Sequence, residues 1–100
     1  MQAPKLLFEA IATKKCVGAV YNRSSIKLAP HILYTRHDEL YLDAVTVERD
    51  AQPPRELKVG TFKIAGLTEL TLTDVPFRTA QLFNPDDPKY AGVSLFAVER

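Results

Sequence analysis

The sequence predicts a mostly β fold with one short N-terminal helix, arranged as a small antiparallel β-barrel. The first observation is a series of about five short strand patterns at roughly eight- to twelve-residue spacing, separated by polar turns, which is typical of small barrels. The second is composition, because 100 residues with 46% apolar and 25% charged side chains suffice for one globular domain with its own core. We therefore expect a single domain over residues 1–100.

The helix is predicted for residues 5–13. Pro4 suits the first position of a helix, and apolar side chains follow it at three- and four-residue spacing. Residues 17–21 form a compact apolar run bounded by a polar turn, and the strand pattern returns over residues 26–34. A second polar turn precedes a third strand pattern at residues 40–48. The first half of the chain thus predicts a helix followed by three antiparallel strands.

The second half alternates strand patterns with breaks. Residues 49–55 contain two consecutive prolines, which cannot donate ladder hydrogen bonds, so this stretch is predicted to be a projecting loop. Strand patterns resume at residues 58–64 and 69–73. Residues 84–88 are rich in turn residues, and residues 90–98 fit either a final strand or a short helix.

Charge and cysteine content narrow the range of functions. The chain has 13 Lys plus Arg and 12 Asp plus Glu, so its net charge of +1 does not argue for nucleic-acid binding. Cys16 is the single cysteine, which excludes an internal disulfide and a thiolate cluster and favours a cytoplasmic setting. No apolar run reaches the ~18 residues that span a bilayer. We expect no membrane association, no metal and no cofactor.

Catalysis is the sharpest hypothesis to weigh. Cys16, His31 and Asp43 could be drawn as a nucleophile, a base and an orienting group, but three scattered residues of these types are common in proteins. The other histidine, His37, lies in a polar turn, where a solvated imidazole is the usual situation. The glycines are isolated and form no phosphate-binding loop. The sequence therefore predicts no catalytic residue and no enzyme.

Four short motifs resemble the core of the WYL domain family. In that family a first strand ends in tyrosine, a second closes on proline, a third carries Trp-Tyr-Leu and a fourth carries a Phe-Arg-Leu-like segment. The corresponding segments here are Val-Gly-Ala-Val-Tyr at 17–21, Ile-Lys-Leu-Ala-Pro at 26–30, Leu-Tyr-Leu at 40–42 and Phe-Lys-Ile at 62–64. The resemblance implies a stand-alone WYL-like domain without a winged-helix segment. It also implies an Sm-like, SH3-type barrel with its core at about residues 6–67 and a C-terminal extension, residues 68–100, packed on it.

Three positions depart from the family pattern. Leu40 replaces the tryptophan, which we expect to cost mainly core volume. Ile26 and Gly66 stand where the family has arginines, and Lys27 is one residue away from the first of these positions. An offset of one residue turns a strand side chain to the opposite face. The basic surface is therefore expected to be thinner here, which favours a ligand with fewer phosphates or a different ligand.

Strand alternation indicates which side chains could form a binding patch. On each of three predicted strands, polar or aromatic side chains face away from apolar residues that would fill the core. Because neighbouring strands lie about 5 Å apart, these side chains could converge into a patch suited to phosphate contact and base stacking. The family resemblance adds Arg55 and supports Lys63 and Tyr41. The predicted ligand-binding residues are Tyr21, Lys27, His31, Tyr41, Arg55 and Lys63.

Simpler interpretations remain open at four of these positions. Lys27 and Lys63 could be solvated positions of half-exposed strands. Tyr21 could be a core aromatic residue whose hydroxyl reaches the rim. Arg55 could serve only to keep its loop soluble.

The sequence thus predicts a regulatory sensor domain that binds a nucleotide or a short single-stranded nucleic acid and modulates transcription or a partner protein. The alternative is a protein-interaction module that pairs through an exposed sheet edge or forms Sm-like oligomers without a ligand. The near-zero net charge favours this alternative. The expected partners are accordingly a nucleotide or single-stranded nucleic acid, a regulatory protein, or further copies of the chain as a homo-oligomer.

Overall fold

The computed structural model describes residues 3–56, 58–81 and 83–98. Within these ranges the chain forms one α-helix, two 3-10 helices and six strands. In chain order they are α1 (Ala3–Thr13), β1 (Lys15–Tyr21), β2 (Ser24–Arg36), β3 (Glu39–Arg49), β4 (Val59–Lys63), η1 (Ile64–Gly66), β5 (Thr68–Pro76), η2 (Pro88–Tyr90) and β6 (Ser94–Ala97).

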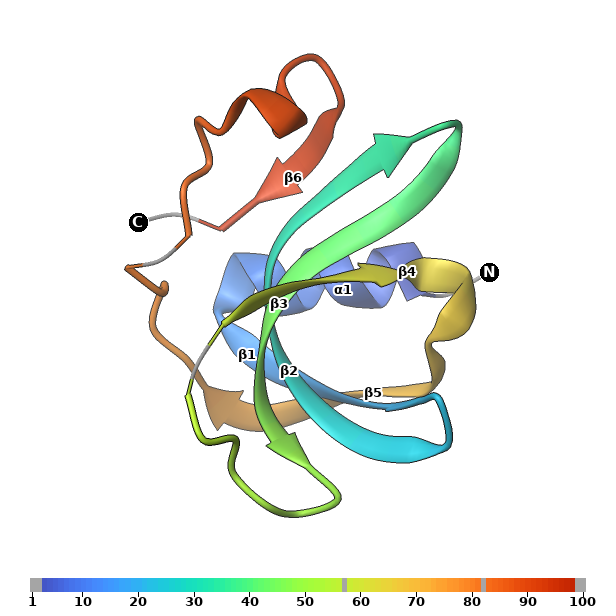
Figure 1. Ribbon diagram of the computed structural model, residues 1–100, viewed down its shortest axis with the longest axis vertical. Coiled ribbons are helices and arrows are strands. Elements are labelled where there is room, and N and C mark those ends of the chain that lie inside the picture. Colours follow the sequence, from blue (N-terminus) through green and yellow to red (C-terminus); the bar gives the residue numbers. More distant parts are fainter. Residues whose placement is uncertain (1–2, 57, 82, 99–100) are drawn as a thin grey trace.

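The strands form one antiparallel sheet in the order β4-β3-β2-β1-β5, with β6 paired to β2 (Figure 1). The long strand β2 pairs with β3 on one side, and on its other side it pairs first with β1 and then with β6. The predicted mostly β, antiparallel fold with one N-terminal helix is confirmed. In the described residues β4 and β5, which end this order, are not paired with each other. Closure into a barrel is therefore not confirmed.

The helix α1 presents an apolar face to the sheet. Leu7, Ala10 and Ile11 are buried, whereas Phe8 and Glu9 between them are exposed, as the 3.6-residue period requires. α1 lies behind the strands in the view of Figure 1 and contacts β1, β2, β5 and β6. In the described part of the chain, no helix has the length and apolar character that a membrane span requires.

Two-residue turns join the first three strands. Asn22 and Arg23 connect β1 to β2, and His37 and Asp38 connect β2 to β3. All four residues have positive φ, from 49° to 66°, which is the backbone of a type I′ turn and matches the twist of a hairpin. The polar turns predicted from the sequence lie at these positions. Because turn length sets the strand register, these turns determine which residues face one another nearby.

The residues that follow β4 return to the sheet twice. The predicted strand at 69–73 is the middle of β5, which pairs with β1. The segment 90–98, for which strand and helix were both open, contains β6, and η2 ends at its first residue. Beside β6, the Val98 amide donates to the His31 carbonyl at 2.7 Å, and the Thr35 amide donates to the Val93 carbonyl at 3.1 Å.

The main core joins α1, the sheet and the segment after β5. Leu7, Leu28, Leu42 and Phe83 belong to it and are at most 2% exposed. Every residue of β2 from Leu28 to Tyr34 is buried, so both faces of this part of the strand are covered. Residues after β5 therefore contribute to the same core as the helix and the central strands.

Replacing Phe83 with alanine should lower the free energy of unfolding by about 3–5 kcal/mol, because a buried ring is lost and a cavity remains. The matched control is Leu95→Ala, which truncates a side chain that is 50% exposed and should change stability by less than about 0.5 kcal/mol. Chemical denaturation followed by circular dichroism measures both values. Equal losses in the two variants would show that Phe83 is not a core residue.

Candidate ligand-binding site

A row of aromatic and basic side chains crosses the sheet near the β2–β3 turn. Tyr34 lies opposite Tyr41 in the β2–β3 register, and Tyr41 lies opposite Lys63 in the β3–β4 register. Directly opposed residues share a face of the sheet, so the three side chains lie side by side. The Tyr34 and Tyr41 rings are stacked, with centroids 6.1 Å apart and an interplanar angle of 26°.

The carboxylate of Asp43 lies next to this row and is fully buried. Its Oδ1 atom accepts hydrogen bonds from the Tyr34 hydroxyl at 2.7 Å and the Thr61 hydroxyl at 2.8 Å. Its Oδ2 atom accepts a hydrogen bond from the Tyr90 hydroxyl and forms an ion pair with Lys89 Nζ at 2.8 Å. Four donors thus satisfy the four lone-pair positions that a carboxylate offers.

These contacts determine how the cluster titrates. Burial alone would raise the pKa of Asp43, but the hydrogen bonds from Lys89, Tyr90, Tyr34 and Thr61 outweigh it and hold that pKa below its usual range. Burial, together with the hydrogen bond to Asp43, raises the pKa of Tyr34 to about 12. The same two causes raise the pKa of Tyr90. Asp43 is therefore a buried anion, and both tyrosines stay protonated and donate to it.

The short helix η2 brings two of the four donors to the sheet. The Asp87 side chain caps η2 by accepting a hydrogen bond from the Lys89 amide at 3.0 Å, and Pro88 occupies its first turn. The Tyr90 ring packs edge-on against Tyr34, with centroids 5.1 Å apart. Lys89 Nζ lies 5.0 Å from the centroid of the Tyr90 ring.

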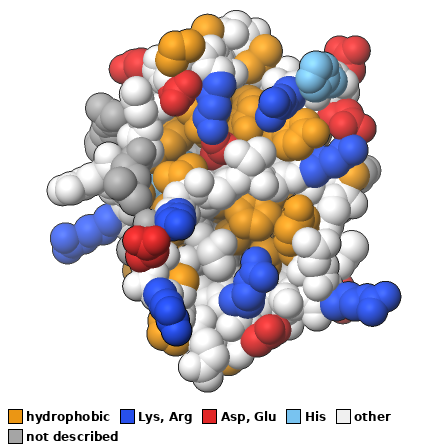
Figure 2. All heavy atoms as spheres, viewed as in Figure 1, with side chains coloured by type: hydrophobic (Ala, Val, Ile, Leu, Met, Phe, Trp, Pro, Cys, Tyr) orange, Lys and Arg blue, Asp and Glu red, His pale blue; other side chains and the backbone are white. Residues whose placement is uncertain are grey.

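A surface pocket of about 430 Å³ opens between the β2–β3 turn and residues 89–93. We call it the hairpin pocket, and the side chains that give it its chemistry are those of Tyr34, Arg36, His37, Thr61 and Lys89. Its lining combines an aromatic ring, a hydroxyl and three groups that can bind an anion. Figure 2 shows that lysine and arginine side chains on this face alternate with acidic and hydrophobic ones and form no continuous basic surface.

Tyr41 and Lys63 are the two predicted ligand residues that the structure brings together. Lys63 Nζ forms an ion pair with Glu39 at 2.9 Å, which raises the pKa of the ammonium group. Tyr41 was predicted to be exposed, but it is half-buried. The reason is that the Tyr34 ring stacks against it and that its face of the sheet, which also holds Asp43, is partly covered by residues 89 and 90.

Three other predicted residues lie away from this row. Tyr21 packs edge-on against Phe62, with ring centroids 5.2 Å apart, and adjoins the main core. Lys27, near the opposite end of β2, forms an ion pair with Glu48 at 3.2 Å. Arg55 is exposed in the loop before β4, whereas Lys63 ends that strand. The predicted convergence of all the polar strand positions into one patch is therefore wrong.

His31 was predicted to face a ligand, but it is fully buried. Its Nδ1 atom lies 2.7 Å from the Ala29 carbonyl, and its Nε2 atom accepts a hydrogen bond from the Ala80 amide at 3.0 Å. This pattern requires a neutral imidazole with its proton on Nδ1. The rings of Phe77 and Phe83 pack against it at centroid distances of 5.2 and 5.1 Å. The segment after β5 covers this face of β2, so the imidazole is part of the packing.

The possible catalytic set does not assemble. The polar groups of His31 and Asp43 bond to the partners described above, and burial raises the pKa of the Cys16 thiol. Among the described residues, no group of three or more His, Cys, Asp or Glu side chains is arranged to hold a metal ion.

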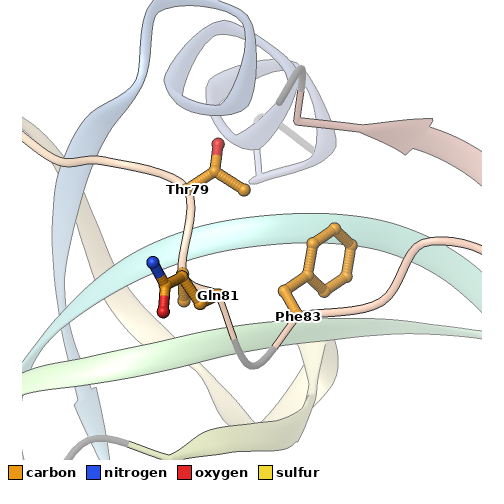
Figure 3. Close-up of a pocket in the computed structure, with 4 residues that line it drawn as sticks. Thr79, Gln81 and Phe83 are labelled. Carbon is orange, nitrogen blue, oxygen red and sulfur yellow. The ribbon is translucent and has the colours of Figure 1, made fainter.

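A second pocket, of about 350 Å³, lies in the connection between β5 and η2. Figure 3 shows Thr79, Gln81 and Phe83 around it, all on one stretch of chain. Ala80 completes the lining, which contains no charged side chain. The hairpin pocket, with its charged and aromatic groups, is therefore the stronger candidate site.

The sequence did not single out most of the residues that build this site. Tyr34 had a usable signal, because a two-residue turn at His37 and Asp38 puts it opposite Tyr41. Lys89 and Tyr90 had none, since they reach Asp43 from 46 and 47 residues further along the chain. Comparisons of the chain with protein families, with curated proteins and with solved structures find no match.

The buried imidazole should make stability depend on pH. Burial lowers the pKa of His31 below its ordinary value of 6.5, so below pH 6.5 the unfolded chain binds a proton that the folded chain does not. The free energy of unfolding should therefore fall as pH drops from 6.5 toward the folded-state pKa, with a limiting slope of about 1.4 kcal/mol per pH unit. His31→Gln, which keeps an acceptor for the Ala80 amide, should lose this slope. His37→Gln, at an exposed turn, should retain it, and equal slopes in all three proteins would contradict the assignment.

Removing the buried carboxylate should be costly. Asp43→Ala leaves three hydroxyl donors and Lys89 without their acceptor and should lower the free energy of unfolding by about 3–5 kcal/mol. Tyr90→Phe removes one donor to a charged group and should cost about 1.5–3 kcal/mol. Asp38→Ala, at an exposed turn position, is the control and should stay within about 0.5 kcal/mol of wild type. Urea denaturation ranks the three, and a loss for Asp43→Ala as small as the control would exclude this role.

Proposed function

We propose that this chain is a WYL-like regulatory sensor that binds a small nucleotide, or a nucleotide unit of single-stranded nucleic acid, in the hairpin pocket. The observation that carries the proposal is the row of Tyr34, Tyr41 and Lys63 beside a pocket that also offers Arg36 and Lys89. Aromatic rings can stack on a base, and guanidinium and ammonium groups bind phosphate.

The finer fold assignment is part of the same proposal. The sheet order, the 3-10 helix between β4 and β5 and the return of β5 to β1 are compatible with an Sm-like, SH3-type barrel that stays open between β4 and β5. The family-like motifs then lie on β1, β2, β3 and β4, and Leu42 and Phe62 of these motifs are buried.

The size and charge of the hairpin pocket favour a ligand with few phosphates. A volume of about 430 Å³ is within the roughly 300–1,000 Å³ of typical small-molecule sites. Two of the nearby cations are already paired, Lys63 with Glu39 and Lys89 with Asp43. A phosphate would thus bind first to Arg36 and compete with a carboxylate for either lysine. This supports a mononucleotide or one nucleotide of a strand over a polyphosphate.

Lys89 offers a route from binding to regulation. Its side chain is 49% exposed in the hairpin pocket and also holds η2 against the buried Asp43. A phosphate that draws Nζ away from Asp43 weakens one of the contacts that fasten η2 and β6 to the sheet. A partner protein or a transcription complex that contacts these elements would then sense the ligand. The proposed setting for this activity is cytoplasmic.

Isothermal titration calorimetry with adenosine monophosphate and with a pentathymidylate strand tests the proposal. Arg36→Ala and Tyr41→Ala should each weaken binding about tenfold, since a stacked base or a charged hydrogen bond contributes roughly 1–3 kcal/mol. For the pentathymidylate, Arg36→Ala should also reduce the salt slope by about 0.7. Arg55→Ala and Lys27→Ala, outside the pocket, are matched controls that should bind as wild type does. No binding of either probe, or equal losses in the control variants, would falsify the assignment.

A further inference from the structure

Two strands of the sheet have a neighbour on one side only. Within the described residues, β4 pairs only with β3 and β5 pairs only with β1. An unpaired strand edge carries backbone donors and acceptors that another strand can complete. The two edges therefore offer complementary backbone surfaces to a second polypeptide.

The edge strand β5 also exposes apolar side chains. Leu72 is 36% exposed and Val75 is 43% exposed, and Leu72 lies opposite the buried Val17 of β1, so it projects from the core-facing side of the sheet. Native edge strands usually carry charges that prevent association, and apolar side chains at such a position favour a covering strand.

The charges that flank the two edges match in one antiparallel register. If Lys63 of one copy lies opposite Glu69 of another, then Lys58 of the first lies opposite Asp74 of the second, because both pairs add to the same residue sum. All four side chains are exposed. Opposite charges in directly facing pairs stabilise a ladder, and like charges oppose it.

The same register also matches the apolar side chains. Phe62 of β4 faces Leu70 of β5, and both pack against the main core of their own chain. Leu72 then faces Gly60, which has no side chain and lies beside the Phe62 ring. The exposed Leu72 would thus gain an aromatic surface to pack against. An apolar row and two charge pairs agree on a single register.

Local features set the length of this pairing. Glu69 has a φ of 52° at a register shift in the β1–β5 ladder, and Pro76 ends β5. The Glu69 carbonyl already accepts a hydrogen bond from Thr71 Oγ1, and the Val75 amide donates to Thr73 Oγ1. The stretch that can pair therefore lies between these two groups and is about as long as β4.

We infer that copies of this chain associate head to tail, with β4 of one copy adding to β5 of the next in the register that joins Lys63 to Glu69 and Lys58 to Asp74. Such an interface uses different surfaces of the two copies, so it forms a ring or an open chain of subunits. Lys63 and Lys58 exchange their exposed ion pairs with Glu39 and Glu56, which costs little because exposed pairs contribute at most about 1 kcal/mol. This inference does not depend on the proposed nucleotide site.

Light scattering after size-exclusion chromatography, over a wide range of protein concentration, tests this inference. Wild type should show a mass above the 11.2 kDa of one chain that increases with concentration. The variant Lys58→Glu/Lys63→Glu and the variant Glu69→Lys/Asp74→Lys should each remain monomeric. Mixed in equal amounts, they should assemble again, because each then presents β4 charges opposite to the β5 charges of the other. Restored assembly in the mixture also shows that both variants fold.

The control is Lys5→Glu/Arg49→Glu, which makes the same change in net charge at exposed positions on α1 and at the end of β3 and should assemble as wild type does. Arg36→Ala should also assemble normally, which separates this interface from nucleotide binding. Monomeric wild type at every concentration would overturn the inference. Full assembly of either charge-reversed variant alone, or no assembly in their mixture, would overturn it as well.

Discussion

Asp43 accepts hydrogen bonds from residues of three different elements, and the arrangement of the C-terminal part of the chain depends on that carboxylate. It is charged and fully buried, which is tolerable only because Tyr34, Thr61, Tyr90 and Lys89 supply four donors. The donors come from β2, β4 and η2, around an acceptor on β3. Removing any one of these elements would leave a buried charge with too few partners. The cluster therefore selects one position for η2 on the sheet, in a way that apolar contacts alone do not.

The cover that η2 and β6 provide changes the meaning of strand alternation. On a sheet with one solvated face, the side chains opposite the core are free for binding. Here the segment after β5 packs on that face around His31 and Asp43, and both are fully buried. What remains accessible is the rim, where Tyr41 and Lys63 meet the hairpin pocket. The candidate site is thus the border between the C-terminal cover and the β2–β3 turn, which makes the cover part of any response to a ligand.

Ion pairing decides what kind of partner this surface can attract. Lys27, Lys63 and Lys89 each have a carboxylate within 3.2 Å, so a chain with a net charge of +1 presents no extended basic field. Long-range attraction of a nucleic acid is weak under these conditions, and short-range stacking and exchange of ion pairs take its place. The same modest charge permits copies of the chain to approach one another. A small ligand at the rim and strand pairing at β4 and β5 are both compatible with this balance.

Local sequence determined the elements of this fold, because periodicity and turn chemistry act over a few residues. The apolar spacing after Pro4 predicted α1, and the polar turns, strand runs and proline-rich loop predicted β1 to β5 within a few residues of their observed ends. It also predicted that Tyr41 and Lys63 would lie together, since adjacent strands bring their side chains side by side. Only the tertiary structure decided that the sheet stays open, that His31 is buried and that donors gather at Asp43. Tyr90 meets Asp43 across 47 residues, and such a contact depends on how η2 and β6 pack, which no local pattern in the sequence records.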